Sequence, residues 1–181
     1  MTQKQDFASP QYFVFKGHNN PVSIIASSPC EPIIVSGERD RVRVWNLFSK
    51  NCIQTLTEHH ADIVDLRFSP HGKLLIIEDT SPQVCIWDWK SARLVKRMKI
   101  TKRKIGAKTV LFSPDSSLLI CLSEDAREMV IWDIKKDEAA HMIKTFRSDI
   151  TCMTLSHDGR FLAVNSKLIE RRRFILNRNA T

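Results

Sequence analysis

The feature that most constrains this chain is a set of landmarks that recur with a nearly constant period. Three Ser-Pro turns and one Ser-His turn are spaced by 41, 44 and 43 residues, beginning at Ser28, Ser69, Ser113 and Ser156. Tryptophans are spaced by 42 and 45 residues, at Trp45, Trp87 and Trp132. Two independent series with one period predict a chain of about four copies of one supersecondary unit.

The first copy shows what the unit contains. It runs from Gly17-His18 through strand-like segments near 22–27, 32–37 and 42–47 to an outer segment over 51–57. Apolar and polar residues alternate in these segments, which is typical of half-buried β-strands. Pro29 and Pro32 bracket a turn, because proline lacks the N–H that a central strand needs. The unit is therefore expected to be a small four-stranded antiparallel sheet.

A Gly-His turn, alternating strands and a hairpin that ends in Trp resemble the WD repeat of β-propellers. Trp87 and Trp132 are each followed directly by Asp. The resemblance implies an all-β fold, a partial β-propeller of three to four four-stranded antiparallel blades. A period near 43 in a chain of 181 residues allows four repeats at most, whereas such propellers have roughly 4–8 blades and usually about seven.

The repeats divide the chain into expected regions. We expect a disordered lead-in over 1–11, blades near 12–50, 51–94, 95–138 and 139–165, and a divergent basic tail over 166–181. Tyr12–Phe15 is expected to be a short apolar strand. Phe174 stands where a Trp is expected, ten residues after Val164. The tail is therefore either a truncated or alternatively spliced end or a divergent strand.

The resemblance implies a buried polar tetrad in the first repeat, formed by His18, Ser36, Asp40 and Trp45. The indole N–H needs an acceptor, the Ser hydroxyl can accept that proton and bond to His, and Asp can hold the other ring nitrogen. Asp40 stands one residue closer to the Trp than is usual in the family, so the sequence leaves the geometry of this tetrad open.

Later repeats keep only parts of the tetrad. The second repeat has His59 and Trp87, but Glu78–Pro82 stands where the hairpin Asp is expected. The third has Trp132, with Arg103 in the His position. We therefore expect incomplete tetrads in both, with stability that depends on apolar packing.

Catalytic and metal sites are not indicated. Ser36 lies inside an expected strand and lacks the strained Gly-x-Ser-x-Gly turn of a nucleophilic serine. His59-His60 beside Asp62 could suggest a metal, but two neighbouring residues on a turn do not easily point the same way, and no third ligand is in register. We expect a protein that is not an enzyme and holds no metal or cofactor.

The charge is strongly basic. The net charge is +8, with a pI near 9.4, which favours an acidic partner such as nucleic acid, an acidic protein or anionic lipid. Seven of the basic residues lie within 96–108. Three interpretations stay open for this run: a solvated sheet edge, a contact with phosphate or acidic peptide, and a nuclear import signal.

Five isolated cysteines and an N-terminus without an apolar core favour a reducing compartment, cytoplasmic and/or nuclear, with no membrane association. In that compartment we expect the chain to act as a WD-type scaffold or adaptor that contacts a protein partner. Its contacts are expected from top-face loops, around Arg39, Arg41, His60, Asp62, Asp79, Lys102, Arg103, Lys104 and Arg127.

Two alternatives to a general scaffold remain. One is a basic nucleic-acid-associated WD protein, of the kind that acts in ribosome biogenesis. The other is a substrate receptor of a cullin-type ubiquitin ligase, because the repeats end in Trp87-Asp88-Trp89-Lys90 and Trp132-Asp133-Ile134-Lys135. Open blade ends also predict self-association, with two copies completing one ring, or a marginally folded chain. A four-bladed closure, with Tyr12–Phe15 against residues 171–176, is the alternative.

Overall fold

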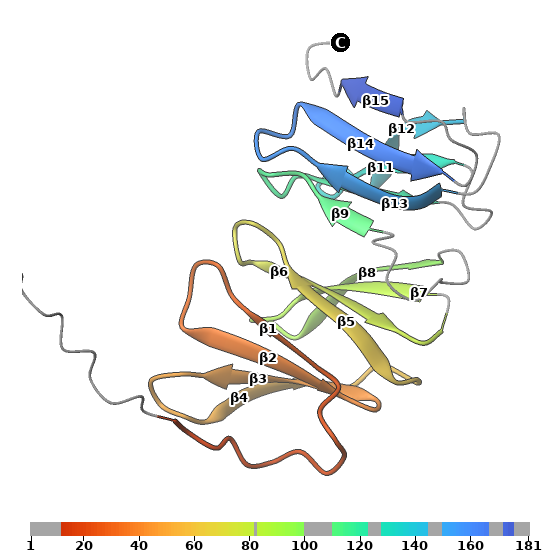
Figure 1. Ribbon diagram of the computed structural model, residues 1–181. Helices are drawn as coiled ribbons and strands as arrows, with labels where there is room; N and C mark the ends of the chain where they lie inside the picture. Colours follow the sequence, from red (N-terminus) through yellow and green to blue (C-terminus); the bar gives the residue numbers. More distant parts are fainter. Residues whose placement is uncertain are drawn as a thin grey trace, which may run out of the picture.

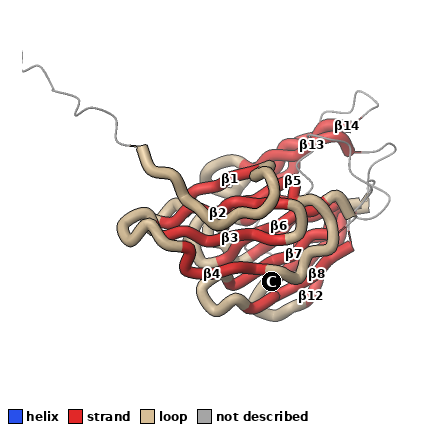
Figure 2. Tube along the Cα trace, turned by 90° about the horizontal axis from the view of Figure 1, so that it is seen from below, coloured by secondary structure: helices blue, strands red, loops and turns tan. Residues whose placement is uncertain are grey.

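The computed structural model describes residues 12–81, 83–99, 110–122, 128–144, 150–166 and 172–175, with side chains to Asn165. Within these ranges the chain forms strands and turns and no helix (Figure 2). The strands build four antiparallel sheets, blades 1 to 4, which follow one another in chain order (Figure 1). Blades 1 to 3 have four strands each, and blade 4 has three. The expected all-β partial propeller is confirmed.

Within each blade the strand order follows the chain. Blade 1 contains β1 (Ile24–Ser27), β2 (Ile33–Glu38), β3 (Arg41–Asn46) and β4 (Cys52–Leu56). Blade 2 contains β5 (Ile63–Phe68), β6 (Leu74–Asp79), β7 (Gln83–Asp88) and β8 (Arg93–Lys99). Blade 3 contains β9 (Val110–Phe112), β10 (Leu118–Leu122), β11 (Met129–Asp133) and β12 (Glu138–Ile143). Blade 4 contains β13 (Ile150–Leu155), β14 (Phe161–Ser166) and β15 (Arg172–Ile175).

The recurring serines close the turns between the first and second strands of the blades. In blades 2 to 4 the hydroxyl accepts the N–H of the residue five positions later, in the pairs Ser69–Leu74 (3.0 Å), Ser113–Leu118 (2.9 Å) and Ser156–Phe161 (2.9 Å). Asp133 closes the turn between β11 and β12 in a similar way, because its Oδ1 accepts the N–H of Lys135 and of Lys136, both at 2.9 Å. The landmarks recur because each blade needs the same turns.

Strand register fixes which residues are equivalent between blades. The third-strand aromatic residue always faces the same position of the second strand, in the pairs Ile34–Trp45, Leu75–Trp87, Leu119–Trp132 and Leu162–Phe174. Phe174 therefore occupies the Trp position, and β15 is the divergent third strand of blade 4. Blade 4 extends beyond residue 165, where the sequence places the start of the tail.

Apolar side chains pack between successive blades. The cluster between blades 1 and 2 includes Val35 and Val44 facing Leu75 and Trp87. Further clusters join blade 2 to blade 3 and blade 3 to blade 4. Each blade thus has two buried faces when it lies between two others, and the outward faces of blades 1 and 4 have no neighbouring blade among the described residues.

The segment before blade 1 does not form the expected strand. Tyr12–Phe15 is paired with no strand among the described residues, and Phe15 lies against Trp45 with 5.2 Å between ring centroids. Blade 1 and blade 4 stand at opposite ends of the series of blades (Figure 1). The four-bladed closure of this segment onto residues 171–176 is therefore wrong for this structure.

Candidate interaction edge and its buried polar clusters

A hydrogen-bonded cluster in blade 1 brings together three of the residues expected to form a tetrad. The Trp45 indole N–H donates to Ser36 Oγ at 2.7 Å, and His18 Nε2 lies 2.5 Å from the same oxygen. Ser36 and Trp45 are buried, and the His18 ring lies 5.6 Å from the Trp45 ring. The hydroxyl thus connects the second strand, the third strand and the segment before β1.

The acidic member of this cluster is Glu38, and the expectation of Asp40 is wrong. Glu38 is fully buried, and its Oε1 lies 3.3 Å from His18 Nδ1. Asp40 is 44% exposed and pairs instead with Arg41, 3.0 Å away. The reason is strand alternation: Ser36 and Glu38 share a face of β2, whereas Asp40 is already in the hairpin turn.

The carboxylate of Glu38 also holds the loop that enters blade 1. Its Oε2 accepts the backbone N–H of Asn19 at 3.0 Å and of Asn20 at 2.8 Å. Burial acts to raise the pKa of Glu38, but the Asn20 N–H, His18 and the Asn19 N–H outweigh it and hold the pKa below the ordinary 4.5. Glu38 is therefore an anion that fixes residues 18–20 against the β2–β3 hairpin.

Blade 2 carries the same two rings without the hydroxyl between them. Ile77 stands at the Ser36 position, because it lies two residues after the partner of Trp87 in β6. The acid that the sequence reading counts as missing is present as Asp79, whose Oδ2 lies 3.7 Å from His59 Nδ1. The Trp87 indole and both ring nitrogens of His59 are buried and have no hydrogen-bond partner among the described residues.

This environment changes the acid–base behaviour of His59. Burial lowers the pKa of His59 below its ordinary 6.5, and the nearby Asp79 carboxylate opposes that effect. Trp87 lies 6.0 Å from the ring. The tetrad of blade 2 is incomplete, as expected, but the missing member is the hydroxyl and not the acid.

Blades 3 and 4 also lack a hydroxyl at the position of Ser36. The Ser36 position holds Cys121 in blade 3 and Val164 in blade 4. Burial raises the pKa of Cys121 to about 12. Trp132 contacts a cation from blade 2, with Lys96 Nζ 4.2 Å from its ring. Arg103, expected at the His position, lies outside the described residues.

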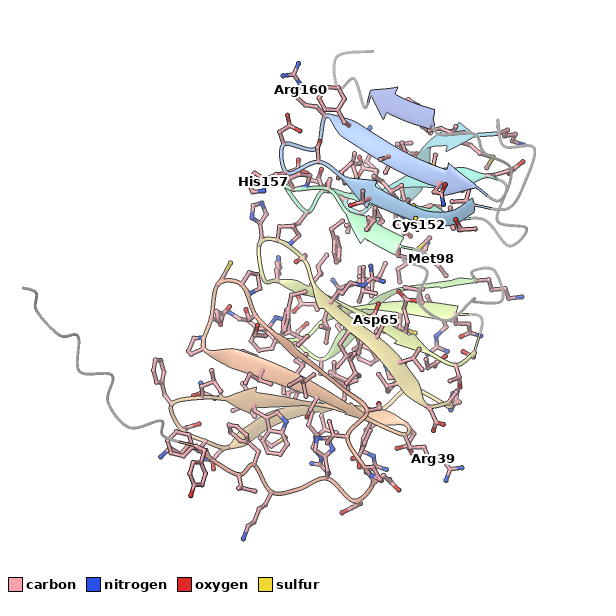
Figure 3. All side chains as sticks on the ribbon, in the orientation of Figure 1. Arg39, Asp65, Met98, Cys152, His157 and Arg160 are labelled. Atoms are coloured by element: carbon pink, nitrogen blue, oxygen red, sulfur yellow. The ribbon has the colours of Figure 1, made fainter. Side chains whose placement is uncertain are left out.

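The loops beside these clusters lie at one side of blades 1 and 2. We call this side the interaction edge, and it consists of residues 19–20, 39–41, 58–62 and 79–81. Arg39, His60 and Asp62 are exposed there. Arg41 is half-buried beside Asp40, and Asp79 is buried beside His59, so Asp79 is not available to a partner. Lys102, Arg103, Lys104 and Arg127 lie outside the described residues. Figure 3 shows Arg39 on one side of the molecule and Arg160 on the other.

The described part of the basic run, residues 96–99, lies in strand β8. Lys96 Nζ pairs with Asp137 of blade 3 at 2.9 Å, and Arg97 donates to the Glu58 carbonyl at 3.0 Å. Arg93 and Lys99 are exposed. Lys96 and Arg97 therefore contact neighbouring loops, which agrees with the interpretation of the run as a sheet edge. Residues 100–108 lie outside the described residues.

Sequence reasoning missed two charged residues that the structure makes central. One is Glu38, which the pattern Ser36-x-Glu38 in an alternating strand could have identified. The other is Arg67, which contacts Asp65 at 3.0 Å and bonds to Glu78 and to the Val110 carbonyl of blade 3. No signal in the sequence marks Arg67, because its partners come from three strands.

The described residues contain neither a metal-binding cluster nor a membrane-spanning helix. No group of three His, Cys, Asp or Glu side chains lies close enough to hold a metal ion. No helix in that part of the chain is long and apolar enough to cross a membrane.

Comparisons with known proteins agree with the geometry. The family model described as WD domain, G-beta repeat, matches residues 9–46 and 50–88. The chain is 24% identical to pre-mRNA-processing factor 19 of Oryza sativa subsp. japonica, over 81% of this chain and 28% of that protein. It is 24% identical to periodic tryptophan protein 2 of Arabidopsis thaliana, over 83% of this chain and 17% of that protein.

A third relative is the small ribosomal subunit protein RACK1y of Oryza sativa subsp. japonica. The chain is 28% identical to it, over 81% of this chain and 45% of that protein. The chain thus spans less than half the length of each of these three relatives.

Proposed function

We propose that this chain, two of whose repeats match the WD-repeat family, is a non-catalytic scaffold that binds a protein partner through its interaction edge. WD-repeat proteins are generally scaffolds, and rigid blades present loops whose side chains determine the partner. The observation that carries the proposal is the Glu38 cluster. The Glu38 carboxylate holds residues 18–20 against the β2–β3 hairpin, and Arg39 is exposed at the tip of that hairpin.

The edge is ordered before a partner arrives. The Thr80 N–H donates to the Asp62 carbonyl at 2.9 Å, so the loop before β5 is held to the β6–β7 hairpin. The exposed groups are of both signs, with Arg39 on blade 1 and Asp62 on blade 2. A fixed surface of mixed charge suits a partner with complementary charges, because less side-chain and loop entropy is lost on binding.

A matched pair of charge reversals tests this function. Arg39→Glu alters the interaction edge, and Arg160→Glu alters an exposed arginine on the opposite side. Proximity labelling in cells with the two variants and the wild type is expected to lose a defined set of proteins with Arg39→Glu and to keep it with Arg160→Glu. Equal loss with both variants, or with neither, would contradict the proposal.

A catalytic role has no support in the blade 1 cluster. Ser36 is buried, and its oxygen is shared by Trp45 and His18. A nucleophilic serine needs access to its substrate and donors for an oxyanion. The Ser, His and Glu side chains are therefore assigned a structural role.

Nucleic-acid association is the second candidate, because two of the relatives are named for pre-mRNA processing and for the small ribosomal subunit. Arg93 and Lys99, two of the exposed cations of β8, would carry it. Binding to generic RNA is then expected to weaken steeply with salt and to weaken further in the double variant Arg93→Glu, Lys99→Glu. Affinity that does not change between low and physiological salt would exclude this mode.

The ubiquitin-ligase variant of the scaffold function depends on Lys90 and Lys135. Lys90 pairs with Glu31 of blade 1 at 2.7 Å, which gives it a role between blades. Lys135 is exposed in the β11–β12 turn. Loss of cullin-complex co-purification with Lys135→Glu, and not with Lys136→Glu in the same turn, is the expected result for a receptor. Either the nucleus or the cytoplasm is compatible with these three proposals.

A further inference from the structure

The outward face of blade 1 carries an apolar residue at a position that is buried in every other blade. Ile25 faces Ser36 in the strand register, and its equivalents face Ile77, Cys121 and Val164. Those equivalents are Leu66, Val110 and Met153, which are 4%, 0% and 2% exposed. Ile25 is 67% exposed. The face of blade 1 thus continues the series of interfaces that joins the blades, without a blade against it.

The outward face of blade 4 shows the opposite shape. Ala163 is exposed at the position where the other blades bury Val35, Ile76 and Ile120. With Cys152, Thr154 and Phe161 it lines an open hollow of about 750 Å³. Cys152 is labelled on β13 in Figure 3. The small side chain of Ala163 therefore leaves space at one end of the series that a bulkier face, such as that with Ile25, can fill.

The segment before blade 1 is built like an outer strand. Phe15 precedes His18 by three residues, as Leu56 at the end of β4 precedes His59. Leu56 is buried and packs in the same cluster as Trp87, and Phe15 likewise lies against Trp45. Tyr12 and Val14 are 90% and 77% exposed. Among the described residues, β15 is paired only with β14, so blade 4 has no outer strand there.

We infer that two copies of this chain assemble end to end, which goes beyond the scaffold function proposed above. The face of blade 1 with Ile25 packs into the blade 4 hollow of the second copy, and Tyr12–Phe15 pairs with β15 of that copy. The same contact repeated by a two-fold axis closes a ring of about eight blades, within the usual range of about 4–8. Each copy thereby supplies an outer strand at the edge of β15, which is open among the described residues of the other copy.

The first test is the mass of the full 181-residue chain in solution, measured by light scattering during size-exclusion chromatography. The wild type is expected to have the mass of two copies. Ile25→Asp is expected to weaken dimerisation by about tenfold or more, because a charge would enter an apolar contact. Ile53→Asp is the matched control, since Ile53 is also exposed but lies on outer strand β4.

Three outcomes of this test would overturn the inference. They are a wild-type monomer, a dimer that Ile25→Asp leaves intact, and larger open chains of copies in place of a closed pair.

A second test does not depend on how Ile25→Asp folds. Two chains are mixed in a Cys30→Ser, Cys52→Ser background. One chain carries Ile25→Cys and Cys152→Ser, and the other keeps Ile25 and Cys152. A short bismaleimide is expected to join them covalently, because residue 25 of one copy meets Cys152 of the other. No product, or equal product when Ile53→Cys replaces Ile25→Cys, would overturn the inference.

Discussion

Blades 1 and 2 have the same strand register, a buried Trp at the same position and a His before the first strand. Only in blade 1 are the indole N–H and the His Nε2 hydrogen-bonded, both to one hydroxyl. Ser36 joins His18 and Trp45 in blade 1, whereas Ile77 separates the corresponding rings in blade 2. A single position in the second strand therefore determines whether the cluster is a hydrogen-bonded network or an apolar core with unsatisfied nitrogens. Leaving buried polar groups unsatisfied costs about 1–3 kcal/mol each.

The largest expected effect comes from changing Ile77. Ile77→Ala should lower the free energy of unfolding by about 3 kcal/mol, because a fully buried side chain is truncated. Ile77→Ser should cost about 1 kcal/mol less than Ile77→Ala, because the hydroxyl can accept the Trp87 indole proton and contact His59. Urea unfolding of both variants measures the difference. A serine variant no more stable than the alanine variant would show that the missing hydroxyl is not what separates the two blades.

Glu38→Ala is expected to be nearly as damaging in blade 1. It removes the acceptor of two backbone N–H groups and the partner of His18, at a cost of about 2–3 kcal/mol. Asp40→Ala should leave the urea midpoint close to that of the wild type, because Asp40 is only partly buried and bonds only to Arg41 among the described residues. If Asp40→Ala were the more damaging variant, the acid of the cluster would have been assigned wrongly.

Ser36→Ala should cost about 1–2 kcal/mol, because the Trp45 indole loses its acceptor. Ser27→Ala is the control, since Ser27 is an exposed serine of the same blade. Denaturation curves of the two variants at equal protein concentration give the comparison. The network would contribute nothing measurable if the two curves coincided.

The smallest effect expected is a pH dependence that differs between the blades. His59 has a lowered pKa, so the unfolded chain binds a proton that the folded chain resists, and stability should fall as the pH drops through 6.5. Glu38 also has a lowered pKa, so its contribution is present above pH 4.5 and is lost only below it.

Urea midpoints between pH 8 and pH 4 separate these two contributions. His59→Gln should remove the decline near pH 6.5 and leave the decline at lower pH, which Glu38→Gln should reduce. A decline near pH 6.5 that persists in His59→Gln would assign it to another group.

The sequence predicted the number and type of blades well, because the turn residues recur for a local physical reason. Ser69 and Ser113 close their turns by hydrogen bonds to residues only five positions away, so their spacing reports the repeat directly. The same is true of the aromatic position, which even identified Phe174 as the alternative to a Trp.

The identity of the buried acids could not be predicted in the same way. Whether Glu38 or Asp40 meets His18 depends on where β2 ends and the hairpin turn begins, and the sequence does not fix that boundary to one residue. The sequence places Asp79 among the top-face loop residues expected to contact a partner, whereas strand alternation turns its side chain toward His59. The sequence also does not predict that Ile25 is exposed, because the residues around Ile25 alternate in the same way as those around the buried Leu66.

Hydrogen exchange of the indole protons tests the difference between the two blades most directly. Trp45 and Trp87 are equally buried, at 3% exposure each, so burial alone predicts equal protection. We expect the Trp45 indole N–H, bonded to Ser36, to exchange much more slowly than that of Trp87, and Ser36→Ala to abolish the difference. Trp89, whose indole donates to the Gly72 carbonyl at 2.7 Å, is the internal reference. Equal exchange rates for Trp45 and Trp87 in the wild type would contradict the account.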